Sequence, residues 1–380
     1  MRKIRKFNAL LLILALLLPS ALAAGEAPAV SAESAILLEA DAGRVLFCRE
    51  PDKPMKGAST VKIMTALLAL EALDPAESVT VRQEWTGCEG SSMYLCAGQE
   101  LTVRELLTGL LLCSGNDAAL ALACLAAGSE EAFVGRMNEK AAALGMENTV
   151  FTDASGLCTE GHSITARDLA LLAREAMRDP LFREIVGCKT ADAGGQPLRN
   201  HNKLLWRDKR VVGVKTGYTR ASGRTLVSAA EENGMTLICV TLNDPCDWED
   251  HLSLLDWGFR TYARVGGEAL RFPVPVVSGA AESVCAVPES PPELLTKSGE
   301  AIHWAVQLPR FVYAPVRAGD SAGSATAYAP DGTEVGSVPL VWEESVPLAE
   351  NAELSFWEKV KWSWYFTCRH STNPMPYIYY

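Results

Sequence analysis

A serine and a lysine three residues apart, at the start of a long apolar run, constrain this chain more than any other feature. The run begins Ser59-Thr60-Val61-Lys62 and continues to Leu70, and Asp74-Pro75 is a stop signal, so the pattern predicts one helix. Ser59 would lie at the helix N-terminus, beside free backbone N–H groups and the positive end of the helix dipole. Lys62 would lie one turn later on the same side. A neutral lysine amine in that place can take the proton of an acylating serine without any histidine.

Alone, this pattern is weak evidence, because a serine N-cap followed by a solvated lysine is its commonest explanation. Two further motifs follow it in the chain. Ser114-Gly115-Asn116 lies at the junction of two predicted helices, although a helix cap explains it equally well on its own. Lys215-Thr216-Gly217 follows a β-branched strand, where a glycine lets a ligand approach the backbone, although a solvated edge-strand lysine is the ordinary alternative. The backbone N–H of Tyr218 would then share an oxyanion with that of Ser59.

The ordered set of motifs supports one chemistry. Ser59 is the predicted nucleophile, Lys62 is its base, and Ser114 would relay a proton to the leaving amine. Asn116 would orient Lys62 and hold the substrate amide. Lys215 would help to keep Lys62 deprotonated and would attract a substrate carboxylate.

The first 23 residues are typical of a secretory signal peptide. A basic start at residues 2–6 precedes the apolar run 9–18 and the small-residue cleavage site Ala21-Leu22-Ala23. The alternative, an uncleaved N-terminal anchor, is less favoured because the apolar run is short for a membrane-spanning helix. Export to the outside of the cytoplasmic membrane is therefore expected.

Composition excludes several other functions. The formal net charge of −11, which becomes more negative once the basic leader is removed, argues against nucleic acid as a partner. The 11 cysteines are odd in number and form no C-x-x-C motif, so we expect mostly buried free thiols instead of a disulfide framework. The five histidines show no metal-ligand spacing, and no metal is predicted.

Apolar runs and turn signals divide the rest of the chain into two kinds of segment. Up to about residue 265, predicted helices and strands are mixed, and Asn233-Gly234 is a strong hairpin signal. The predicted strands are 35–39, 44–48, 211–214, 225–230 and 235–242, and the predicted helices after the first are 102–112, 118–127, 132–144, 169–177 and 252–259. Residues 266–348 contain only short strands broken by proline and glycine, which predicts a small all-β sandwich domain.

These motifs resemble those of the D-alanyl-D-alanine carboxypeptidases, the low-molecular-mass penicillin-binding proteins of the serine peptidase S11 family. The resemblance rests on segments 58–71, 110–119 and 214–219, with further similarity at 153–157, 161–162, 165–170 and 254–259. It covers residues 30–265 closely and the β domain loosely, through 314–319.

The resemblance implies a fold, a reaction and a site. The fold would be α+β, with a β-lactamase/transpeptidase-like domain, an antiparallel sheet flanked by helices, in residues 24–265. The enzyme would remove the terminal D-alanine from the peptidoglycan stem pentapeptide through an acyl-enzyme on Ser59, which water resolves and β-lactams trap. Thr216 would bind the substrate carboxylate together with Lys215. No cofactor is implied.

Two positions depart from the family pattern. Cys113 replaces the usual proline before Ser-Gly-Asn, which would loosen that turn. Asp247 lies where family members often carry an arginine that helps to hold the carboxylate. Arg220 and Arg224 are the candidate substitutes.

The tail, residues 349–380, has two interpretations. Apolar side chains on one helical face, with lysines outside it, suit an amphipathic segment on a membrane surface and resemble the C-terminal anchors of the family. The other is a short helix packed on the β domain, because further aromatic residues interrupt the face. The residues concerned are Phe356, Trp357, Val360 and Trp364 on the face, Lys359 and Lys361 outside it, and Trp362, Tyr365 and Phe366 as interruptions.

Two other functions remain open at this point. A class A β-lactamase shares S-x-x-K and K-T-G, but it would normally carry Ser-Asp-Asn and no C-terminal β domain. An inactive penicillin-binding scaffold of the cell envelope is the second alternative, and the three intact motifs argue against it.

Overall fold

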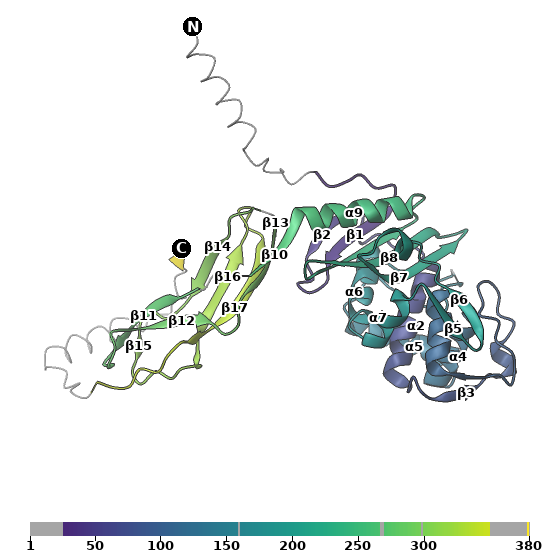
Figure 1. The fold of residues 1–380 in the computed structure, drawn as a ribbon, viewed down its shortest axis with the longest axis horizontal. Coiled ribbons are helices and arrows are strands. Elements are labelled where there is room, and N and C mark those ends of the chain that lie inside the picture. The colour runs from purple at the N-terminus through teal and green to yellow at the C-terminus, as the bar shows by residue number, and fades with distance from the viewer. Residues whose placement is uncertain (1–25, 159, 267–269, 298, 350–377, 380) are drawn as a thin grey trace, which may run out of the picture.

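The protein is described here by a computed structural model (Figure 1). It describes residues 26–158, 160–266, 270–297, 299–349 and 378–379 of the chain. The predicted signal peptide lies outside these residues, and so does the part of the predicted tail that carries its aromatic residues and lysines.

The N-terminal unit is built on one antiparallel sheet with the strand order β2-β1-β9-β8-β7. Its strands are β1 (Ser34–Glu39), β2 (Val45–Arg49), β7 (Val211–Thr219), β8 (Gly223–Glu232) and β9 (Met235–Leu242). Both faces of the sheet are covered, so its central strands have apolar residues at successive positions. Ile36 and Leu38 belong to the larger core, whereas Leu37 belongs to a second core under α9. The strand β7, which carries Lys215, lies at one edge of the sheet.

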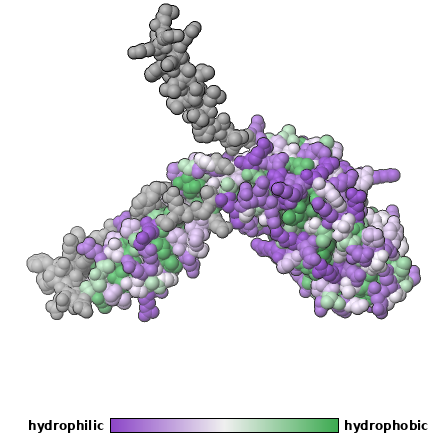
Figure 2. Space-filling model, viewed as in Figure 1, coloured by the Kyte–Doolittle hydropathy of each residue, from purple (hydrophilic) through white to green (hydrophobic). Residues whose placement is uncertain are grey.

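Helices cover the two faces of this sheet unequally (Figure 1). The long helix α9 (Asp247–Thr261) packs on one face together with the short helix α8 (Leu204–Arg207), since Leu204 and Leu205 belong to the same core as α9. The other helices gather on the opposite side (Figure 1). These are η1 (Ala58–Val61), α2 (Lys62–Ala72), η2 (Gln83–Trp85), α3 (Val103–Leu112), α4 (Asn116–Ala127), α5 (Glu130–Ala143), α6 (Ala166–Ala176) and α7 (Pro180–Gly187). Two small two-stranded antiparallel sheets also belong to this unit, formed by β3 (Ser78–Thr80) with β4 (Glu100–Thr102) and by β5 (Thr190–Ala193) with β6 (Gln196–Arg199). In the view of Figure 2, hydrophilic side chains predominate on the surface of this unit.

After α9 the described chain is all β. One sheet has the order β15-β11-β12-β17-β16-β14-β18, and β10 pairs separately with β13. The strands are β10 (Tyr262–Gly266), β11 (Phe272–Val277), β12 (Ser283–Pro288), β13 (Glu293–Lys297), β14 (His303–Gln307), β15 (Val312–Tyr313), β16 (Ser321–Tyr328), β17 (Glu334–Trp342) and β18 (Ile378–Tyr379). Leu295 of β13 packs in the core under α9, and its carbonyl accepts a 2.7 Å hydrogen bond from Arg44 Nη1. The β10–β13 pair therefore contacts the N-terminal unit.

Several element predictions are confirmed and some need correction. Asn233 and Gly234 both have positive φ, as the predicted hairpin turn requires. The motif Lys215-Thr216-Gly217 lies inside β7 and not after it, because β7 continues to pair with β8 as far as Thr219. The last predicted helix is longer than expected, since α9 begins at Asp247. Among the described helices no single one is long and apolar enough to cross a membrane, and one bent pair, α4 with α5, passes that test jointly.

The prediction that most cysteines are buried is wrong. Ten cysteines are described and all ten are free thiols, but of these ten one alone, Cys239, is buried. Cys48, Cys96, Cys158 and Cys246 are exposed, because they lie on an edge strand, in loops or just before a helix.

Candidate active site

Ser59 lies in a tight 3-10 turn and not at the N-cap of the α-helix. The turn η1 precedes α2, whose first residue is Lys62, and Ser59 makes no capping hydrogen bond. The neighbouring Thr60 closes the turn instead, since its hydroxyl donates to the carbonyl of Gly57 at 2.6 Å. The alternative explanation of Ser59 as a helix N-cap is therefore wrong, and its hydroxyl contacts Lys62.

Lys62 is a buried amine in contact with the serine. Its Nζ lies 3.1 Å from Ser59 Oγ and donates to the carbonyl of Ser155 at 2.7 Å. Burial lowers the pKa of Lys62 well below its ordinary value, and the positive charge of Lys215 lowers the pKa further. A lysine amine with a lowered pKa, at hydrogen-bond distance from a hydroxyl, has the geometry of a general base.

The loop of residues 153–156 contacts Lys62, although the sequence alone predicted no role for it. The Asp153 carboxylate accepts backbone N–H groups from Ser155 at 2.7 Å and Gly156 at 2.6 Å. Gly156 has a φ of +78°, and a Cβ there would lie 1.9 Å from the carbonyl oxygen of Ala58. The loop therefore packs directly on the turn of Ser59, and its Ser155 carbonyl orients the amine. The sequence signal was an Asp whose side chain caps its own turn.

Ser114 lies at the junction between α3 and α4 in a strained backbone conformation. Its φ is +65°, and its Oγ is buried without a hydrogen-bond partner among the described residues. The turn is held by two donors to the carbonyl of Gly109, namely Cys113 Sγ at 3.1 Å and Gly115 N at 3.2 Å. Cys113 thus contributes to the turn that it was expected to loosen.

Asn116 is the first residue of α4 and not its cap, because Gly115 occupies the N-cap position. Its Nδ2 donates to the carbonyl of Glu89 at 2.6 Å. The described hydrogen bonds of Lys62 lead to Ser59 and Ser155, so the orienting role of Asn116 stays a prediction.

Lys215 is nearly as deeply buried as Lys62. Its side chain is 1% exposed, and its Nζ donates to the carbonyl of Thr216 at 3.0 Å. Burial lowers its pKa from the ordinary 10.5 to about 7. A positive charge on Lys215 lowers the pKa of Lys62, so protonation of Lys215 disfavours protonation of Lys62.

Gly217 brings the edge strand against the serine. A Cβ at this position would lie 3.0 Å from the backbone nitrogen of Ser59 and 2.4 Å from Thr225 Oγ1, so only glycine allows this approach. Tyr218 follows, with its side chain 66% exposed. The two N–H groups predicted to hold an oxyanion are thus carried by segments in direct contact.

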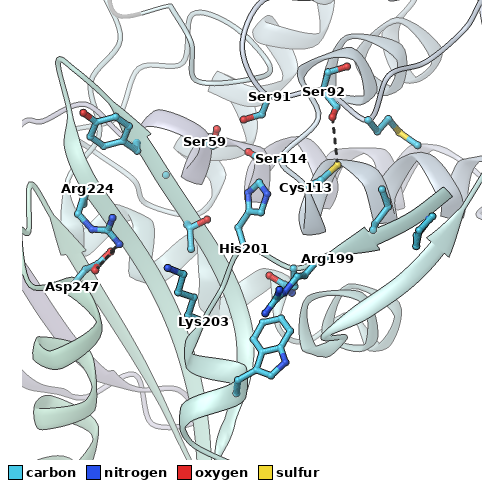
Figure 3. A pocket seen from close by; sticks show the side chains of 18 of the residues that line it. Ser59, Ser91, Ser92, Cys113, Ser114, Arg199, His201, Lys203, Arg224 and Asp247 are labelled. Atoms are coloured by element: carbon cyan, nitrogen blue, oxygen red, sulfur yellow. Dashed lines mark hydrogen bonds and ion pairs between the residues drawn. The ribbon is translucent and has the colours of Figure 1, made fainter.

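These elements surround a pocket of about 800 Å³ (Figure 3). Five of the residues predicted from sequence line it: Ser59, Ser114, Thr216, Gly217 and Tyr218. Lys62, Asn116 and Lys215 are buried behind this lining. No group of three or more metal-ligating side chains is arranged for a metal ion in the described part of the chain.

An arginine pairs with the aspartate that departs from the family pattern. Arg224 of β8 and Asp247 of α9 both line the pocket, with 2.8 Å between Nη2 and Oδ2. The guanidinium also lies over the Trp248 ring, 5.4 Å from its centroid. Burial raises the pKa of Asp247 and the contact with Arg224 opposes that shift. Of the two candidate substitutes, Arg224 is the one that lines the pocket.

The chain is similar to known proteins in both sequence and structure. The chain matches the family described as D-alanyl-D-alanine carboxypeptidase, peptidase S11, over residues 21–246. It is similar to the D-alanyl-D-alanine carboxypeptidase DacF of Bacillus subtilis, with 31% identity over 338 residues, 84% of this chain and 86% of DacF. It is also similar to DacB2 of Mycobacterium tuberculosis, with 38% identity over 240 residues, 60% of this chain and 82% of DacB2. Penicillin binding protein 5 from Haemophilus influenzae has a similar structure, with a TM-score of 0.72 at 27% identity, covering 85% of this chain and 99% of that one.

A serine beside a buried lysine, under the edge of an antiparallel sheet flanked by helices, defines the broad class of serine acyl-enzymes with a transpeptidase-like fold. The expected fold class is confirmed by the likeness to penicillin-binding proteins. Because the family match spans more than half of the chain, the protein belongs to the D-alanyl-D-alanine carboxypeptidase family of serine peptidases, S11.

Proposed function

We propose that this protein is a serine-type D-alanyl-D-alanine carboxypeptidase, which removes the terminal D-alanine from the peptidoglycan stem pentapeptide. The observation that carries the proposal is the 3.1 Å contact between Lys62 Nζ and Ser59 Oγ, with the lysine buried and its pKa lowered. Membership of the S11 family supplies the substrate class.

The proposed acylation step follows from this geometry. Lys62 takes the Ser59 proton, and Oγ attacks the carbonyl carbon of the penultimate D-alanine. The backbone N–H groups of Ser59 and Tyr218 stabilise the oxyanion, a contribution that is typically worth about 10²–10³ in rate per donor. When the C–N bond breaks, Ser114 passes a proton to the departing amine. Water then hydrolyses the ester and restores the serine.

The substrate carboxylate is proposed to bind beside β7. Thr216 lines the pocket, and Lys215 lies directly behind it with its amine on the Thr216 carbonyl. Arg224 supplies a half-buried guanidinium in the same pocket, whereas family members often carry an arginine at the position of Asp247 instead. The proposed carboxylate site therefore uses a cation from β8 in place of one from α9.

The proposal extends to location and organisation. An enzyme that acts on peptidoglycan works outside the cytoplasmic membrane, in agreement with the predicted signal peptide 1–23. We propose a catalytic unit in residues 24–265, a β unit in 266–348, and a tail that contacts the outer face of the membrane. β-Lactams are expected to acylate Ser59 and to be released slowly.

Release of D-alanine from diacetyl-L-Lys-D-Ala-D-Ala tests the function. Wild type should release it, Ser59→Ala should not, and Ser78→Ala is the matched control, since Ser78 is exposed outside the pocket. Mass spectrometry after incubation with penicillin should show a long-lived adduct on Ser59. Rapid penicillin turnover would indicate a β-lactamase, and the absence of both adduct and D-alanine release would indicate a scaffold.

A further inference from the structure

The segment that joins β6 to α8 has a strict alternation that the proposed mechanism does not use. Its sequence is Arg199-Asn200-His201-Asn202-Lys203. The two asparagines are buried, whereas the three basic residues are exposed and line the pocket. Alternate side chains of this segment therefore face opposite sides, two into the protein and three towards the pocket.

The buried asparagines fix the backbone of this segment. Asn200 Nδ2 donates to the carbonyls of Val186 at 3.1 Å and Cys188 at 2.9 Å, and its Oδ1 accepts from Asn202 N at 2.9 Å. Asn202 Oδ1 in turn accepts from Leu204 N at 3.1 Å. The backbone of the exposed residues is thus held in place before any ligand binds, which reduces the entropy lost on binding.

Two of the exposed side chains carry positive charge without a carboxylate partner. Within the described residues Arg199 and Lys203 have no ion pair, in contrast to Arg224, which is paired with Asp247. The Arg199 guanidinium lies over the Trp206 ring, 5.1 Å from its centroid, which fixes its plane and leaves its N–H edge available. Desolvation and the charge of Lys215 lower the pKa of His201, so the charge of this segment at neutral pH comes from Arg199 and Lys203.

The position of these cations separates them from the proposed site for the terminal carboxylate. In the view of Figure 3, Arg224 and Asp247 lie on one side of the pocket and Arg199 on the other, with Lys203 reaching in between. The pocket, at about 800 Å³, lies in the upper part of the range for ligand pockets, roughly 300–1,000 Å³. It therefore has room for more of the peptide than two small terminal residues.

We propose that Arg199 and Lys203 form a subsite for a second carboxylate, carried by the residue that precedes the two D-alanines. The inference rests on the proposed function and narrows the substrate: the preferred stem peptide has a third residue whose side chain carries a carboxylate, and not lysine. Two unpaired cations on a fixed backbone, in an otherwise acidic protein, select this group by charge-assisted hydrogen bonds.

The test uses two peptides that differ by one carboxylate. One is diacetyl-L-Lys-D-Ala-D-Ala, and in the other meso-diaminopimelate, with its distal amine acetylated, replaces the lysine. We expect wild type to favour the second peptide about tenfold in kcat/KM, the value of one charge-assisted hydrogen bond. This preference should shrink at high salt. In Arg199→Gln/Lys203→Gln the ratio should fall towards one, and in the control Lys209→Gln, an exposed lysine outside the pocket, it should stay at the wild-type value.

Three outcomes would overturn the inference while leaving the proposed function intact. They are a wild-type ratio near one, a double variant that keeps the wild-type ratio, and a double variant that loses activity equally on both peptides, which would assign these cations to the shared terminal carboxylate. Failure of the proposed function looks different, because wild type would then release no D-alanine from either peptide, or Ser59→Ala would release as much as wild type.

Discussion

Deprotonation of Lys215 above neutral pH should lower the activity of the protein and raise its stability. The side chain is 1% exposed, and burial moves its pKa from 10.5 to about 7. At 1.36 kcal/mol per pKa unit, this shift corresponds to a preference for the neutral form of roughly 5 kcal/mol. If a charged Lys215 attracts the substrate carboxylate, kcat/KM for D-alanine release should fall tenfold per pH unit above about pH 7. Bound carboxylate favours the charged amine, so the corresponding fall in kcat should begin at higher pH.

Stability should change in the opposite direction over the same pH range. The folded-state pKa of Lys215 is lower than its unfolded value, so between about pH 7 and pH 10.5 the unfolded chain binds more protons. The free energy of unfolding contributed by this group therefore rises with pH in that window. Relative to Lys215→Met, wild type should gain roughly 3 kcal/mol between pH 7 and pH 9.5. Urea unfolding of both proteins at the two pH values measures this difference.

The variant Lys215→Arg supplies the matching kinetic control. A guanidinium stays charged throughout this range, so the alkaline fall in kcat/KM should disappear even if the absolute rate is reduced. A wild-type kcat/KM that stays level through pH 9 would refute the assignment. The same fall of kcat/KM at alkaline pH in Lys215→Arg would refute it as well.

Three further substitutions test the contacts around the serine. Gly217→Ala should slow acylation by a fluorescent penicillin about 10²-fold, because the new Cβ pushes the edge strand away from the oxyanion site; Gly135→Ala, whose Cβ meets nothing, is its control, and equal rates in the two would contradict the reasoning. Arg224→Gln should raise KM for the peptide and destabilise the fold by about 1–3 kcal/mol, since it leaves Asp247 buried without its cation; adding Asp247→Asn should restore stability but not KM. Asp153→Asn should lower the rate of acylation by the fluorescent penicillin, with little change in the free energy of unfolding measured without penicillin. An unchanged acylation rate would show that this loop does not contribute to the site.

Periodicity and turn chemistry account for what the sequence could predict. The helix α3 begins where Thr102 and Glu105 form a reciprocal capping box, and such a signal lies within four residues. The β8–β9 hairpin likewise follows from two adjacent residues that tolerate positive φ, Asn233 and Gly234. In each case the decisive interaction is local, so a short stretch of sequence is enough to predict it.

Contacts between segments that are distant in the sequence could not be predicted in this way. The carbonyl that orients Lys62 belongs to Ser155, and any residue type could supply a carbonyl. The pairing of Arg224 with Asp247 depends on β8 and α9 lying side by side, so the sequence left Arg220 equally open. Cysteine burial failed for the same reason, because hydrophobic character does not reveal which loops the core covers.

Two non-glycine residues with positive φ lie at the proposed active site. Ala58 and Ser114 have φ values of +47° and +65°, a region that costs a non-glycine residue of order 1 kcal/mol. Neither position is glycine, although glycine would relieve the strain, and the proposed proton transfer needs the hydroxyl of Ser114. The strain persists because packing determines both turns, through the loop of Gly156 against Ala58 and two donors to the Gly109 carbonyl beside Ser114. A sequence pattern can point to such a serine, but its strained backbone and its unpartnered hydroxyl appear only in the folded chain, and both fit the proposed transfer of a proton from Ser114 to the leaving amine.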